Sequence, residues 1–116
     1  MNEEAHAILV GARALDGLNM RMAALAHNLA NANTPRFQSV AVNFEESLRV
    51  AEAKGDEALK ALRFSFTAGP VYEANDERRI DLLIADASQT AMRYSALVDM
   101  LGRRLALRSI ALGGQR

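Results

Sequence analysis

The chain has 116 residues, at most one domain, and its 14 Lys and Arg residues balance its 14 Asp and Glu residues. Half of the residues are hydrophobic, but only 5% are aromatic and Trp is absent, which favours helix–helix contacts over a bulky core. The zero formal net charge argues against strong nonspecific nucleic-acid binding, and the lack of Cys removes disulfides, thiolate zinc sites and cysteine nucleophiles.

The N-terminus is acidic where a secretory signal would be basic, and it carries Glu3 and Glu4. No apolar run approaches the roughly 20 residues of a transmembrane helix. We therefore expect a soluble chain with no cleavable signal peptide and no membrane insertion of its own.

A long amphipathic helix is predicted from Ala5 to Ala32, with Asn2 as a candidate N-cap. Apolar residues recur every seven positions in two series offset by three, which is a coiled-coil-like pattern. Gly11 falls in one series, where it weakens the seam or lets another backbone come close. The two series are Ile8, Leu15, Met22 and Leu29, and Gly11, Leu18, Leu25 and Ala32.

After Pro35 the apolar period becomes two, and Val40, Val42 and Phe44 predict a weak extended segment. A short helix is expected from Glu45 to Lys54, followed by one or two helical turns over Asp56–Leu62.

Alternation then returns over Leu62–Phe66, until Gly69 and Pro70 are expected to interrupt it, and Val71–Glu73 resumes the extended pattern. The apolar content of this region is thin, so ordering only against partners stays an alternative.

A second long helix is predicted from Ile80 onward. The fold class is therefore mainly α: N- and C-terminal amphipathic helices pair in a coiled-coil-like seam, around a short irregular or β-containing middle. We expect one structural unit of three segments, 1–34, 35–78 and 79–116. The heptad series of the second helix are Ile84, Ala91, Val98, Leu105 and Leu112, and Ile80, Ala87, Tyr94, Leu101 and Arg108.

No residue pattern points to an enzyme, a cofactor or a metal. His6 and His27 are 21 positions apart and in no metal-ligand spacing, and neighbouring carboxylates on a helix point in different directions. We therefore expect no catalytic, cofactor-binding or metal-binding residue. The C-terminal arginines either complement a helix C-terminus or contact a neighbouring subunit; they are Arg103, Arg104, Arg108 and Arg116.

The stretch from Asn28 to Phe37 alternates asparagines with small apolar residues and then runs into Thr34-Pro35, which predicts a helix end. The same N-L-A-N-A-N-T-P run resembles the signature of the bacterial flagellar rod, hook and hook-associated proteins. With the V-x-F-E-x-x-L segment at 42–48, the chain resembles the B-type basal-body rod proteins, although the C type is close in size and the choice stays open. The residues that carry the motif are Asn28, Ala30, Asn31, Thr34, Pro35 and Phe37.

Arg36 stands where this family usually has Gly, so any turn there that requires a positive φ falls on a non-glycine residue. Nearer the C-terminus, Ile80-Asp81-Leu82 is similar to the family's V-D-L segment.

The resemblance implies a structural subunit, exported by the flagellar type III apparatus, that polymerises into the proximal rod of the basal body. Its implied partners are other rod subunits, basal-body ring proteins and export-gate proteins. A small cytoplasmic helical adaptor or chaperone-like dimer is the alternative; it explains the heptads but not the asparagine motif. In the assembly, the expected seam is formed by Ile8, Leu15, Leu18, Met22, Leu25 and Leu29 against Ile84, Val98, Leu101 and Leu105.

Overall fold

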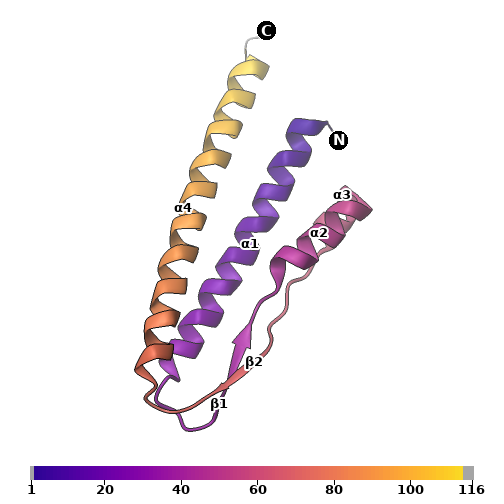
Figure 1. Cartoon of the computed structure of the whole chain (residues 1–116). Coiled ribbons are helices and arrows are strands. Elements are labelled where there is room, and N and C mark those ends of the chain that lie inside the picture. Colours follow the sequence, from indigo (N-terminus) through magenta and orange to yellow (C-terminus); the bar gives the residue numbers. More distant parts are fainter. Residues whose placement is uncertain (1, 114–116) are drawn as a thin grey trace.

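The computed structural model describes residues 2–113, and the fold is mainly α, as expected. Helix α1 lies between α4 on one side and a hairpin and an arm of two short helices on the other (Figure 1). The molecule is elongated, with extents of 63 × 26 × 14 Å. The elements in chain order are α1 (Glu3–Ala30), β1 (Phe37–Ala41), α2 (Phe44–Lys54), α3 (Asp56–Ala61), β2 (Thr67–Tyr72) and α4 (Glu77–Gly113).

Helix α1 begins and ends where its capping residues predict. The Asn2 side chain accepts a hydrogen bond from the Ala5 N–H at 2.7 Å, which satisfies one of the free donors of the first turn. Glu3 and Glu4 add negative charge at the positive end of the helix dipole. At the other end Asn31 is the C-cap, and its backbone N–H donates to carbonyls of the last turn.

Two glycines let neighbouring elements approach α1 closely on different faces. Gly11 faces α4: a Cβ added there would lie 2.6 Å from Cδ2 of Leu101. Gly17 faces the start of α2, and an added Cβ would fall within 3.0 Å of the ring and the Cβ of Phe44. Of the two alternatives for Gly11, a weakened seam or the close approach of a backbone, the second is wrong in detail, because the group that comes close is a leucine side chain.

The buried side chains form two clusters along α1. The first cluster joins α1 to the start of α2 and includes Leu18, Ala24, Val42 and Phe44, with Leu97 of α4 packed against it. The second cluster joins α1, β2 and α4. It consists of Leu25, Tyr72 and Leu83, with Phe37 and Ala87 at its edge.

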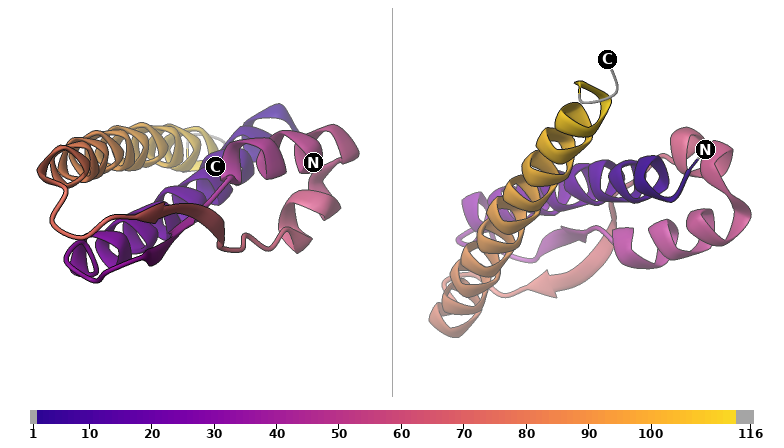
Figure 2. Two further views of the ribbon diagram at one scale, coloured as in Figure 1. Left: turned by 60° about the horizontal axis from the view of Figure 1, so that its bottom comes forward. Right: turned by 90° about the horizontal axis from the view of Figure 1, so that it is seen from above.

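Helix α4 runs beside α1 with both chain ends on the same side of the molecule, and the two helices are inclined to each other (Figure 2). Its inward face uses the expected series through Ile80 and Leu101, except for the exposed Tyr94, and the companion series lies three residues further on, not four. The observed companion row contains the polar residues Thr90 and Arg104. The expected row, which contains Ile84 and Val98, is more apolar, so a prediction from apolar content alone selects the wrong row. The α4 residues that are not exposed are Arg79, Ile80, Leu83, Ala87, Thr90, Leu97, Leu101, Arg104 and Arg108.

The two strands pair in an antiparallel sheet, and the arm of α2 and α3 lies in the connection between them. We call this pair of strands the hairpin, and its details differ from the expectation. Strand β1 covers Phe37–Ala41, so Val42 and Phe44 are not in it, and Phe44 begins α2 because its ring packs onto Gly17. The expected interruption at Gly69 and Pro70 is also wrong, because β2 runs through both residues.

A bulge in the sheet accommodates Pro70. The register shifts between Gln38 and Val40, so that Gly69 and Pro70 together lie opposite Ser39. The buried Ser39 hydroxyl donates to the Pro70 carbonyl at 2.5 Å, and it lies where a Cβ on residue 69 would be. Glycine at 69 is therefore required by close packing.

We expect Gly17→Ala to lower the free energy of unfolding by about 1–2 kcal/mol. Overpacking against a ring costs about 1–3 kcal/mol, and the better helix propensity of Ala returns only about 0.5–1 kcal/mol. Gly11→Ala should cost less, because the end of a flexible Leu side chain can move. Urea denaturation measures all three variants, with Gly102→Ala as the control: Gly102 has open space around it and should gain stability. Equal losses at Gly17 and Gly102 would contradict the packing argument.

Candidate assembly surface

The first asparagine of the motif joins α1 to the hairpin. Asn28 is 4% exposed, and its side-chain amide donates to the Val40 carbonyl at 2.8 Å while its Oδ1 accepts the Val40 N–H at 2.9 Å. These two backbone groups lie on the edge of β1 that β2 does not pair. Asn28 therefore completes the sheet edge from the helix, as a neighbouring strand would.

The second asparagine and the threonine close the turn after α1. The Asn31 side chain donates to the His27 carbonyl at 2.9 Å, and the Thr34 hydroxyl donates to Asn31 Oδ1 at 3.2 Å. The Ala32 carbonyl accepts the Asn75 N–H at 3.3 Å, which connects this turn to the turn before α4. The motif therefore holds both turns at one end of the molecule.

Arg36 has a left-handed backbone conformation. Gly, which the resemblance leads one to expect at this position, adopts this conformation readily. Its φ is +54°, whereas L residues other than Gly disfavour this region by roughly 1–2 kcal/mol. The residue after it, Phe37, is half-buried, with its ring centroid 6.4 Å from that of Tyr72 and 5.3 Å from that of His27. The remaining motif residues, Ala30, Thr34 and Pro35, are exposed.

An arginine on α1 fastens the start of α2. The Arg21 guanidinium donates to both carboxylate oxygens of Glu45 at 2.6 and 2.7 Å and to the Val42 carbonyl at 3.0 Å, and it lies 4.5 Å from the centre of the Phe44 ring. These hydrogen bonds hold the pKa of Glu45 below its usual value. Arg93 of α4 approaches the same carboxylate at 3.8 Å, so all three layers meet at this residue.

A histidine near the N-terminus of α1 attaches the tip of the arm. His6 Nδ1 lies 2.5 Å from Asp56 Oδ1, and Nε2 lies 3.3 Å from Glu52 Oε1. The hydrogen bond with Asp56, followed by that with Glu52, raises the pKa of His6 above 6.5. The imidazole separates the two carboxylates, and the described residues contain no group of His, Asp and Glu that could hold a metal ion.

The expected seam residues have different environments. Leu18, Leu25 and Leu101 are buried inside the chain. Ile8, Leu15 and Met22 are half-buried, and Leu29 at the end of α1 is 37% exposed.

On α4, Ile84, Val98 and Leu105 are 49%, 45% and 51% exposed, so they do not face α1 of the same chain. Contact with another chain stays a prediction for these three. Together with Ala91 and Leu112 they form a row at intervals of seven, which we call the outer stripe.

The C-terminal arginines do not complement the C-terminal end of α4, because its last turn contains no basic residue among those described. Arg104 donates to Glu4 at 3.1 Å, across the N-terminal end of the α1–α4 contact. Arg103 pairs with Asp99 at 3.0 Å on the exposed side. Arg116 lies outside the described residues.

Sequence patterns alone did not identify several contacts that organise this surface. Gly17 lay outside both predicted series, so its close approach to Phe44 was not predicted. Asn28 was assigned to a helix end, and its pairing with Val40 across 12 positions has no local signal.

In the part of the chain that the structure describes, no helix is long and apolar enough to cross a membrane.

A comparison with protein families gives one finding: the family described as "Flagella basal body rod protein" matches residues 8–38. The matched stretch includes most of α1, the asparagine motif and the start of β1. It supports a rod protein family and a structural role in the flagellar basal body; the family is not an enzyme family, and the match does not distinguish the B type from the C type. No curated protein matches the chain.

We expect Asn28→Ala to lower the free energy of unfolding by about 2–6 kcal/mol, because two backbone groups at the edge of β1 lose their partner and each unsatisfied group costs about 1–3 kcal/mol. Thermal or urea unfolding measures the loss. Asn19→Ala is the matched control, because Asn19 is exposed on the same helix. A loss no larger than that of the control would show that the edge of β1 does not need the amide.

Stability should also depend on His6 in a defined pH range. A raised pKa means that the folded state favours the protonated ring, so this contribution is full below pH 6.5 and is lost as the pH rises through the folded-state pKa. As the pH rises above 6.5, the melting temperature should therefore fall more steeply in the wild type than in His6→Gln. An NMR titration that places the His6 pKa at or below 6.5 would contradict this, with His27→Gln identifying the second imidazole signal.

Proposed function

With its N-terminal helix matching the flagellar basal body rod family, we propose that this chain is a subunit that polymerises into the proximal rod through its N- and C-terminal helices. The outer stripe of α4 is the observation that carries this proposal. It presents Ile84, Val98, Leu105 and Leu112 at about half exposure along one side of α4, next to the narrow face that packs against α1.

The amount of exposed apolar side chain on α4 favours a partner. Fully burying one Leu, Ile or Val contributes about 1.5–3 kcal/mol, and monomeric proteins rarely leave a long continuous apolar surface in water. Other large apolar residues, on other faces of α4, are also exposed. They are Leu82, Met92, Met100, Leu107 and Ile110.

The arrangement of layers favours contact with another chain over rearrangement within one chain. Helix α1 is covered by α4 on one side and by the hairpin and arm on the other, so it has no second long apolar face to offer the outer stripe. Segments 1–34 and 79–116 then form the assembling part. Segment 35–78, which contains the hairpin and the arm, is attached to it.

The proposed setting follows from the family. The chain would be exported without a cleavable signal peptide and would assemble in the periplasmic part of the basal body, with other rod subunits, ring proteins and export-gate proteins as neighbours. The motif that matches the family also fixes the two turns at one end, so it shapes the end that a subunit presents to its neighbours.

Val98→Asp tests the proposal. Val98 is 45% exposed, so the isolated chain should keep its helicity and melting temperature, whereas sedimentable assembly and motility should be lost because a charge enters the contact between subunits. Circular dichroism, sedimentation and a swimming assay measure the three outcomes.

The matched control is Gln89→Asp, an exposed α4 position outside the outer stripe, which should assemble normally. Leu25→Asp is unsuitable, because Leu25 lies in the core beside Tyr72 and Leu83, and its substitution tests folding. Normal motility with Val98→Asp, or a purified wild-type chain that forms only a stable, cooperatively melting dimer, would overturn the proposal.

A further inference from the structure

The C-terminal part of helix α4 extends beyond the N-terminal end of α1. Its last residues therefore have no other helix of the chain beside them. Among the described residues, the last ion pair between the two helices along this edge joins Arg104 and Glu4, and α4 runs on to Gly113 (Figure 1). We call residues 105–113 the overhang. Its large apolar side chains are all at least half exposed: Leu105, Leu107, Ile110 and Leu112, at 51%, 66%, 70% and 58%.

The surface that holds α1 continues along the overhang. Leu97 and Leu101 face α1, and the same spacing of three and four residues leads to Arg104, Arg108 and Ala111. An open notch of about 540 Å³ lies there, lined by Glu4, Arg104, Leu107, Arg108 and Ala111. The established α1–α4 interface therefore continues beyond α1, in the direction in which another helix in line with α1 would extend it.

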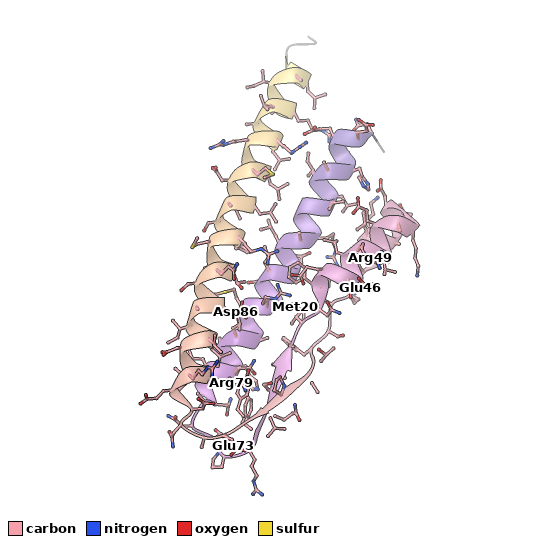
Figure 3. The ribbon with its side chains drawn as sticks, viewed as in Figure 1. Met20, Glu46, Arg49, Glu73, Arg79 and Asp86 are labelled. Carbon is pink, nitrogen blue, oxygen red and sulfur yellow. The ribbon has the colours of Figure 1, made fainter. Side chains whose placement is uncertain are left out.

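The charges at this end suit the opposite end of another copy. No acidic residue follows Asp99 up to Gly113, and Arg108 makes no ion pair among the described residues. Cations are stabilised beside the C-terminus of a helix, where the unpaired carbonyls carry partial negative charge. The C-terminus of α1 is such an end, with Leu29 exposed on it and Glu73 in the adjacent turn (Figure 3).

The complementarity extends to the N-terminus of α1. Its first turn is acidic and contains the exposed Glu3, whereas the turn after α1 carries Arg36, also exposed. Stacking two copies in the same orientation brings these opposite charges together and aligns the two α1 dipoles head to tail.

We propose that the overhang of one copy receives the C-terminal end of α1, from Leu29 to Arg36, of a second copy. This contact joins two different surfaces, so each copy keeps one free end of each kind and the chain of copies can grow. The inference rests on the proposed function, which it deepens by naming the segment that each subunit presents along the axis of the assembly.

Disulfide trapping tests the contact in the full-length chain, which contains no native Cys. The double variant Ala30→Cys with Ala111→Cys carries one thiol at each end, both at exposed helical alanines. The two positions lie at opposite ends of a molecule 63 Å long, so they cannot pair within one chain. After mild oxidation, we expect a ladder of dimers, trimers and longer products on a non-reducing gel.

The control replaces the α1 partner by a residue of the arm: Ala53→Cys with Ala111→Cys, again two exposed alanines. It should give no ladder, and each single variant should stop at the dimer. A sedimentable assembly in which the Ala30–Ala111 variant yields no more ladder than this control would overturn the head-to-tail contact and leave the proposed function standing. If no variant or wild-type sample assembles and no ladder forms, both proposals fail.

Discussion

The need to cover α1 on two faces determines most of this structure. Gly11 receives the side chain of Leu101 from α4, and Gly17 receives the ring of Phe44 at the start of α2. These two close approaches bring both neighbours near enough to bury the side chains around them. Because α4 is fixed by one narrow face, the rest of its circumference remains available, and that circumference is apolar over much of its length.

The asparagine motif acts on tertiary structure as much as on the helix end. Asn31 caps α1, but Asn28, one turn earlier, bonds both backbone groups of Val40 and so aligns the hairpin with the helix. A buried amide with two partners of fixed direction specifies one register, which an apolar side chain cannot do. This explains why such a motif suits a subunit whose ends have to be shaped reproducibly.

The two unpartnered regions of α4 have different geometry, and the difference suits an extended assembly. The outer stripe runs along the side of the helix, whereas the overhang extends beyond the end of α1. An end contact between unlike surfaces can repeat along one direction, and a side contact through the outer stripe would add a second direction. The family match at residues 8–38 supports a rod component, and these surfaces offer such a component a way to bind its neighbours.

Periodicity and capping residues determined both long helices, the N-cap at Asn2, the short helices on either side of Gly55 and the helix end in the asparagine motif, because these depend on neighbours within a few positions. Only tertiary structure decided which apolar row of α4 faces α1. Rows three and four residues away from Ile80 are both neighbours on a helix, and the row containing Thr90 and Arg104 is buried although the alternative is more apolar. Leu83 of the buried row packs with Leu25 and Tyr72, and that contact exists only once α1, β2 and α4 meet.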